Sequence, residues 1–334
     1  MAVLTRSIKT MLLSARLSLR QRSIRDNKSV LYMFEIWIPI TIAAAFFQNL
    51  RSALQKYLKG RLSTCGSAYA RFFYALPFAF IYILGLHELG GYAYPEPNLK
   101  FLLFCLLGGI SQILFTVFLL WMFSFKSFAV GTTFSKLEVL AVAVLGALIL
   151  GDGLNRLAIA AIVLGAIGVI ALSVGQSGVT VKSVVAGLKE KSTMIGLVCA
   201  TWLGGSVVFF RGASLSLGHE NVVMAAGYSL TIALVIQTVL MGGYLLIREK
   251  GEFGRVVKNW RWAGAVGVAG VLASICWFTA FTYQNASYVR ALGQIELLFT
   301  FVATTVFFKE KVSRLELGGI LLVSSGIVLI ILAA

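Results

Sequence analysis

The sequence predicts an all-α polytopic membrane protein with ten transmembrane helices, arranged as two inverted five-helix repeats. Three observations support this fold class. Of the 334 residues, 59% are hydrophobic and only 13% are charged, which leaves too little polar surface for a soluble protein of this size. The apolar residues fall into runs of about twenty, the length that crosses about 30 Å of hydrocarbon. The two halves of the chain also end in similar sequences.

The apolar runs follow one another with short connections between them. The longest connections, 87–99, 175–191 and 248–259, are too short for a separate soluble domain. Glycine is frequent, with 33 residues, and lets membrane helices pack closely. The predicted spans are 36–55, 66–86, 100–123, 127–149, 155–174, 192–212, 221–247, 260–283, 286–308 and 314–333.

The first thirty residues form a basic segment in which Asp26 is the single acidic residue. We expect residues 1–33 to be a tail outside the bundle, and three interpretations remain open. The segment is a basic amphipathic tail on the membrane surface, a stretch upstream of a start at Met33, or an Arg- and Ser-rich transit peptide. A secretory signal is not expected, because the segment has no apolar core followed by a small-residue cleavage site.

The net charge and the cysteines limit which binding partners, metal sites and cofactors the chain is expected to have. The net charge of +16 comes from basic residues in the tail and in short connections, which favours contact with anionic lipid headgroups over nucleic acid. The four cysteines are isolated and there are two histidines, so we expect no metal site, no disulfide framework and no cofactor. No phosphate-binding GxxxxGK[ST] motif is present, and no nucleophile–base constellation points to an enzyme.

An internal repeat joins the end of the first half to the end of the second half. A constant offset of 158 residues aligns about 35 residues without a gap. Because each half has five predicted spans, the two copies must cross the membrane in opposite directions. Inverted repeats of this kind are typical of secondary transporters, which bind their solute near the midplane between the copies. The matched pairs are Glu138 with Glu296, Asp152 with Glu310, Arg156 with Arg314, and Gly168 with Gly326.

These patterns resemble the EamA-type transporters of the drug/metabolite transporter superfamily. The similar features are a mid-helix Glu, the helix ends at 150–152 and 308–310, a Gly-rich last span and the Arg71-Phe72 pair in the second span. The chain departs from the family at Val139 and Leu297, where the family often has Pro, and at Asp152, which replaces a Glu. The resemblance covers roughly residues 34–334 and assigns EamA-like repeats to 34–175 and 192–334. It implies a carrier for small metabolites in a bacterial inner membrane, often an exporter.

Two carboxylates lie near the middle of their spans. Glu138 and Glu296 are about eleven and ten residues into predicted helices, or roughly 15 Å deep at 1.5 Å per residue. A charge at this depth is costly unless it is paired or hydrated, so each is a candidate for binding substrate or coupling protons. The alternative is a structural ion pair or hydrogen bond to a neighbouring helix.

Further candidates accompany the carboxylates. Lys136 and Gln294 are matched by the repeat. They lie on a different helix face from Glu138 and Glu296, about 200° away. We expect one of these faces to line the cavity and the other to meet a neighbouring helix, and the sequence does not indicate which. Arg71 and Arg290 are candidates for substrate contact but are near enough to helix ends to reach the interface. Arg51 and Arg211 end the first span of each half, and their symmetry favours an interface-anchor role. Aromatic candidates for a pocket are Tyr74, Trp202, Trp277 and Tyr283, although Trp and Tyr also collect at membrane interfaces or pack between helices.

Orientation signals conflict. The resemblance and the basic tail place both termini in the cytoplasm, yet most basic residues of the connections would then be external, against the positive-inside rule. Taken together, the sequence favours a secondary transporter of a small molecule such as an amino acid or amine, with protons as a candidate coupling ion. A flippase for a lipid-linked molecule and a membrane-embedded enzyme remain alternatives. The sequence does not indicate an oligomeric state.

Overall fold

The computed structural model describes residues 36–55, 58, 61–122, 134, 137–177, 191–306 and 313–334. The regular secondary structure in this part of the chain is helical throughout. The basic tail, Lys136 and Glu310 lie outside the described residues, as does part of the basic connections on which the orientation argument depends. The helices span residues 36–55, α2 Thr64–Phe73, α3 Leu76–Glu88, α4 Leu99–Met122, α6 Glu138–Leu145, η1 Gly146–Leu150, α7 Arg156–Ser177, α9 Lys191–Ser216, α10 Val222–Arg248, α11 Glu252–Lys258, α12 Trp260–Tyr283, α13 Ala286–Leu292, α14 Ile295–Val306 and α15 Arg314–Ala333.

Seven stretches of the described chain are long and apolar enough to cross a membrane. They coincide with seven of the predicted spans to within a few residues. The other three predicted spans contain the helix over residues 36–55, the shorter apolar helix Glu138–Leu150, and the pair α13 and α14. The prediction of a multi-pass helical membrane protein is confirmed. The spans are 65–88, 99–118, 156–175, 193–216, 222–248, 260–283 and 314–333.

Several helices are interrupted within a predicted span, which the hydropathy pattern does not reveal. α2 ends at Phe73 and α3 begins at Leu76, with Pro77 in its first turn. Proline has no N–H to donate to the preceding turn, so the helix breaks there. α14 begins just before Glu296 and α6 begins at Glu138, so both carboxylates lie in the first turn of a helix. The positive end of the helix dipole favours a carboxylate at that position.

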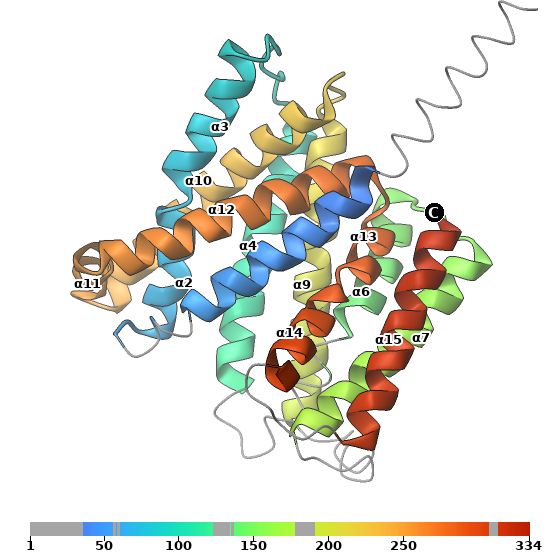
Figure 1. Ribbon diagram of the computed structural model, residues 1–334. Coiled ribbons are helices and arrows are strands. Elements are labelled where there is room, and N and C mark those ends of the chain that lie inside the picture. The colour runs from blue at the N-terminus through green and yellow to red at the C-terminus, as the bar shows by residue number, and fades with distance from the viewer. Residues whose placement is uncertain are drawn as a thin grey trace, which may run out of the picture.

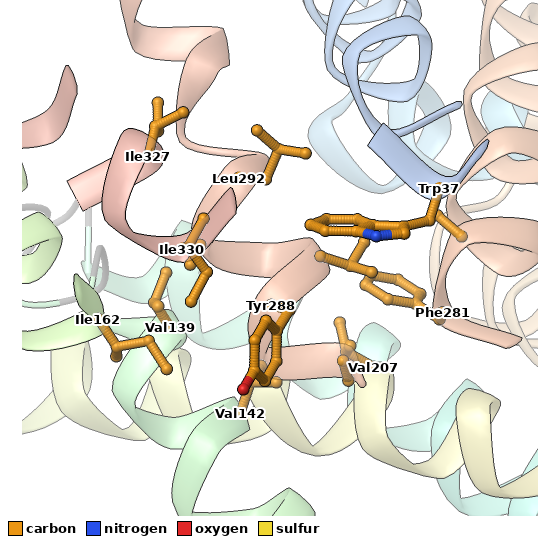
Figure 2. Packing of buried hydrophobic residues seen from close by; sticks show 14 of the residues in the cluster. Trp37, Val139, Val142, Ile162, Val207, Phe281, Tyr288, Leu292, Ile327 and Ile330 are labelled. Atoms are coloured by element: carbon orange, nitrogen blue, oxygen red, sulfur yellow. The ribbon is translucent and has the colours of Figure 1, made fainter. Parts of the chain in front are cut away.

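The two predicted repeats are packed together rather than set apart. α4 of the first half lies along α9 of the second, and α7 lies along α15 (Figure 1). The largest apolar cluster draws residues from the helix over 36–55, α6, α7, α9, α12, α13 and α15. Figure 2 shows Trp37 beside Phe281, and Val142 beside Tyr288, within this cluster. Helices of both halves therefore share one apolar core.

The outer surface is apolar, as lipid requires. Large hydrophobic side chains such as Ile81 and Leu84 on α3, and Val239 and Ile247 on α10, are exposed. In water such a surface would mark an interface or cause aggregation, but against acyl chains it is the expected exterior.

Glycines allow the closest approach of two helices, α7 and α15. A Cβ placed on Gly319 would lie 2.6 Å from the backbone N of Leu172 and 2.9 Å from the backbone O of Gly168. A Cβ on Gly326 would lie 3.0 Å from the backbone O of Ala161. Small residues are the usual means by which membrane helices bring their backbones together. The matched glycines of the repeat, Gly168 and Gly326, therefore both lie in this interface.

We expect Gly319→Ala to lower the melting temperature of the detergent-solubilised protein, because its methyl group would push α15 away from α7. Overpacking of this kind costs about 1–3 kcal/mol. The matched control is Gly318→Ala, where a Cβ meets nothing within 4 Å. The control should be neutral or slightly stabilising, since alanine is the better helix former. Equal melting temperatures for both variants would contradict the close α7–α15 contact.

Candidate functional site

A cavity of about 320 Å³, lined by both polar and apolar side chains, lies in the middle of the bundle. Its depth follows from α4, where Gln112 is thirteen residues from the first residue, Leu99, and ten from the last, Met122. At 1.5 Å per residue this is close to the midplane. The cavity is lined by Gln48, Arg51, Arg71, Gln112, Phe115, Glu138, Leu203, Ser206, Val207, Phe210, Ser274, Trp277, Phe278, Phe281, Arg290 and Glu296.

An ion pair between the two halves forms part of the wall. Nη2 of Arg290, in the last turn of α13, donates to Oε1 of Glu138, in the first turn of α6. The residues are only 7% and 6% exposed, so the pair is largely shielded from water. The guanidinium also lies 5.0 Å from the ring centroid of Trp277. Each helix end suits its charge, since a helix N-terminus favours an anion and a C-terminus a cation.

A second network holds the other carboxylate. Nε2 of Gln48 donates to Oε2 of Glu296, and Nδ2 of Asn49 donates to the backbone O of Glu296 at 3.1 Å. The indole N–H of Trp277 donates to Oε1 of Gln48 at 3.0 Å. The chain of bonds therefore fixes the amide of Gln48 and joins α12 and α14 to the helix over 36–55.

Gly293 makes room for this network at the junction of α13 and α14. A Cβ on Gly293 would lie 2.6 Å from Cη2 of Trp277. Any other residue would displace the indole that orients Gln48. The ring of Trp277 is also stacked on Phe281, with centroids 5.4 Å apart.

The comparisons with known proteins agree with this architecture. Residues 191–332 match the model of the EamA-like transporter family. This part of the chain is therefore similar to the EamA-like transporter family. A solved structure titled "Crystal structure of protein" aligns with a TM-score of 0.61 and 14% identity, covering 88% of this chain and 95% of that chain, which shows a shared fold. None of the curated proteins compared with the chain matches it.

The family match confirms the resemblance to EamA-type transporters over residues 191–332 and has a functional consequence. EamA-like proteins are membrane transporters of small molecules, and the chain is an integral multi-pass membrane protein. Members are transporters rather than enzymes. A concave, partly aromatic cavity with a few convergent polar groups is the form that small-molecule sites take.

The helix end that resembles the EamA pattern has a visible structural role. Gly151 has a φ of 71° and ends η1, a left-handed conformation that glycine adopts without strain. The turn directs Asp152 toward Arg211 of α9, where Oδ1 and Nη2 are 3.3 Å apart. Nη1 of Arg211 also donates to the backbone O of Phe281, and to that of Gln284 at 2.6 Å. These carbonyls are at the end of α12, where a helix has no partners of its own.

The cavity brings together five of the residues singled out in the sequence. Glu138, Glu296, Arg290, Arg71 and Trp277 all line it. Their roles in binding or coupling remain predictions. Lys136 lies outside the described residues, so its position relative to this cavity is not part of the structure.

Four other candidates lie elsewhere. Gln294 lines a separate small pocket between α7 and α15. Of the two faces distinguished in the sequence, the one that carries Glu296 therefore meets the cavity. The hydroxyl of Tyr74 donates to the backbone O of Val256 at 3.3 Å. Trp202 and Tyr283 are half-buried and are not among the residues that line the cavity.

Sequence reasoning gave too little weight to the polar residues that complete the wall. Gln112, Ser206 and Ser274 line the cavity and were not singled out. Gln112 had a readable signal, because an amide in the middle of an apolar run needs a partner in lipid. Its Oε1 accepts a hydrogen bond from Nε2 of Gln237 at 2.6 Å. Arg51 was interpreted as an interface anchor, but its side chain lines the cavity.

Proposed function

We propose that this chain is a secondary transporter that exports a small metabolite, such as an amino acid or amine, across a bacterial inner membrane by alternating access. The observation that carries the proposal is the charged cavity at mid-depth between the two halves, in a chain whose second half is EamA-like. A buried site with groups of both charges suits a small polar solute better than a lipid-linked one.

We also propose that the transport unit is ten helices in two inverted repeats, over residues 34–175 and 192–334. The likeness to a solved structure over 88% of the chain supports one fold that includes both halves. The α7–α15 contact through glycines that the repeat matches supports the same symmetry. The start of α6 and α14 beside equivalent glutamates supports the discontinuous helices that many transporters use at their binding sites.

Two features support alternating access. The ion pair of Arg211 with Asp152, together with the bonds of Arg211 to the end of α12, ties α9, the turn after η1 and α12 at one end of the bundle. Asn285 adds a hydrogen bond to the backbone O of Gly153 at 3.4 Å. These contacts are polar and local, so they can break when the carrier opens at this end.

Glu296 is the candidate for proton coupling. Glu138 is held by a buried arginine, whereas Oε2 of Glu296 accepts from the neutral amide of Gln48. A carboxylate that lines a cavity at membrane depth and stands outside the Arg290–Glu138 ion pair can gain and lose a proton while that pair stays intact. Proton binding and solute binding at Glu296 would then exclude each other.

We expect Glu296→Gln to abolish solute-driven proton movement in liposomes that contain the purified protein. The measurement is the internal pH change after addition of a panel of amino acids and amines, with counterflow of the same solutes as a second readout. Glu220→Gln, an exposed carboxylate beside α10, is the control and should behave as wild type. Proton movement that persists in Glu296→Gln would place coupling elsewhere. Failure of every solute to move in the wild type would overturn the carrier proposal and favour the lipid alternative.

A further inference from the structure

The charges around the cavity do not balance. Among the described lining residues there are three guanidinium groups, Arg51, Arg71 and Arg290, and two carboxylates, Glu138 and Glu296. Glu138 is paired with Arg290, and Glu296 is bonded to Gln48. In the described part of the chain no ion pair joins Arg51 or Arg71 to a carboxylate. The described wall therefore carries one surplus positive charge.

The two arginines without an ion pair lie next to each other. Measured from the position of a Cβ on Gly270, Cδ of Arg51 is 3.5 Å away and Cγ of Arg71 is 3.9 Å away. The absence of a side chain at this point of α12 lets both stems approach the same place. Nε of Arg51 is buried and has no hydrogen-bond partner among the described residues. The guanidinium of Arg71 lies over the ring of Phe72, 4.6 Å from its centroid.

Two like charges held this close at membrane depth repel each other and have lost much of their hydration. An anion between them removes the repulsion and gives the buried donor a partner. The planar guanidinium offers a fork of N–H groups that matches a carboxylate in two parallel hydrogen bonds. The arrangement is therefore that of an anion site.

We propose that Arg51 and Arg71 bind the carboxylate of the transported solute, and that a carboxylate is required for recognition. This inference rests on the proposed transport function and narrows its substrate class. One carboxylate neutralises the single surplus charge, whereas a phosphate monoester, which carries about −1.5 to −2, overcompensates it. An amine without a carboxylate meets a net positive wall, because both glutamates are already engaged.

The rest of the cavity defines what the carboxylate is attached to. Phe210 and Phe278, with ring centroids 4.9 Å apart, line the cavity and a small side pocket that also contains Arg71 and Gly270. A cavity of about 320 Å³ holds a small solute. The substrate class is a small carboxylate with an apolar portion, and the charge balance favours a free monocarboxylate over an amino acid, whose ammonium would face the positive wall.

The test compares matched solutes that differ at the carboxylate. The probes are phenylalanine, phenylalaninamide, 3-phenylpropionate and phenethylamine, with the corresponding leucine set. Binding is measured as the ligand-induced rise in melting temperature of the purified protein, and transport as counterflow in liposomes. We expect the carboxylates to bind and to move, and the amide and the amine to bind about ten- to a hundredfold more weakly.

Variants locate the site. Arg71→Met and Arg51→Met should remove the preference for carboxylates, and Arg71→Lys should keep part of it, because a charge remains without the fork. Gly270→Leu fills the space between the arginines and should abolish binding with both charges intact, whereas Gly270→Ala makes only ordinary contacts and should bind normally. Arg261→Met, an exposed arginine over Trp260 on α12, is the control.

The outcomes separate this inference from the transport proposal. If amines or amides are transported as well as carboxylates, the carboxylate site is overturned and the proposal of a carrier stands. Carboxylate binding without any counterflow supports the site and overturns the carrier. The variants Arg71→Lys and Gly270→Leu both keep the positive charge of the wall, so they test the site even if the methionine variants fail to fold. If both prefer carboxylates over amides and amines as strongly as the wild type does, the site is also overturned.

Discussion

Replacing Arg290 by methionine is expected to remove transport and to destabilise the protein by about 3–5 kcal/mol, the usual result of leaving a buried carboxylate without its partner. Glu138 is only 6% exposed and forms an ion pair with the guanidinium of Arg290. Methionine keeps the unbranched stem of the side chain, so the loss reflects the missing guanidinium charge more than missing packing. Because the pair joins α13 to α6, the variant also loosens the contact between the two halves.

A double-mutant cycle tests this explanation. Glu138→Gln combined with Arg290→Met removes both charges, so the double variant should regain most of the stability that Arg290→Met loses. Thermal unfolding in detergent is the measurement. The control is Arg261→Met, which replaces an exposed arginine on α12 and should cost less than about 0.5 kcal/mol. A double variant as unstable as Arg290→Met alone would show that Arg290 acts through packing, for example against Trp277.

The sequence predicted the positions of the long helices well, because a helix must be apolar over the length that crosses the hydrocarbon core of the membrane. It did not reveal the interruptions. The break before Pro77 and the one at Gly293 each fall inside a single predicted span, and hydropathy carries no information about the backbone within a span. Pro77 was a local signal for the first break. At Gly293 the reason is tertiary, since the indole of Trp277 occupies the space where a side chain would be.

The charged residues of the cavity were predictable for a physical reason. A charge in the middle of a span is too costly to be retained without a partner, so Glu138 and Glu296 stood out from one sequence alone. Their pairing with particular partners was not predictable, although Arg290 had been singled out as a candidate. Arg290 and Gln48 reach the carboxylates from more than 150 residues away, and a sequence without its contacts does not indicate which polar groups meet.

Arg51 and Arg211 show the limit of reasoning from the repeat. Their equivalent places predicted equivalent roles as interface anchors. In the structure Arg211 is tied to Asp152 and to the end of α12, whereas Arg51 lines the cavity. Two matched positions can differ in this way because, in any one conformation of a carrier, one end of the bundle is closed and the other is open. The repeat describes only the sequence that the two halves share.

This asymmetry leads to the second large effect. Replacing Arg211 by methionine should slow counterflow by at least about tenfold, because the variant cannot close the end of the bundle near Asp152. Each hydrogen bond from a charged donor is worth about 1.5–3 kcal/mol, and the variant loses the two to the carbonyls of α12 as well as the ion pair. A loss of about 3 kcal/mol shifts an equilibrium between closed and open states by more than a hundredfold.

The open end can be detected independently of transport. Ser274 lines the cavity, so a Ser274→Cys variant, in a chain without Cys65, Cys105, Cys199 and Cys276, reports access to it. A polar maleimide should label this cysteine faster when Arg211 is replaced, because a second route to the cavity is open. Arg156→Met, an exposed arginine at the start of α7 beside the same turn, is the control and should leave labelling and counterflow unchanged. Faster labelling with normal counterflow would mean that closure at this end is dispensable, and that the Arg211 cluster stabilises the helix end without gating the cavity.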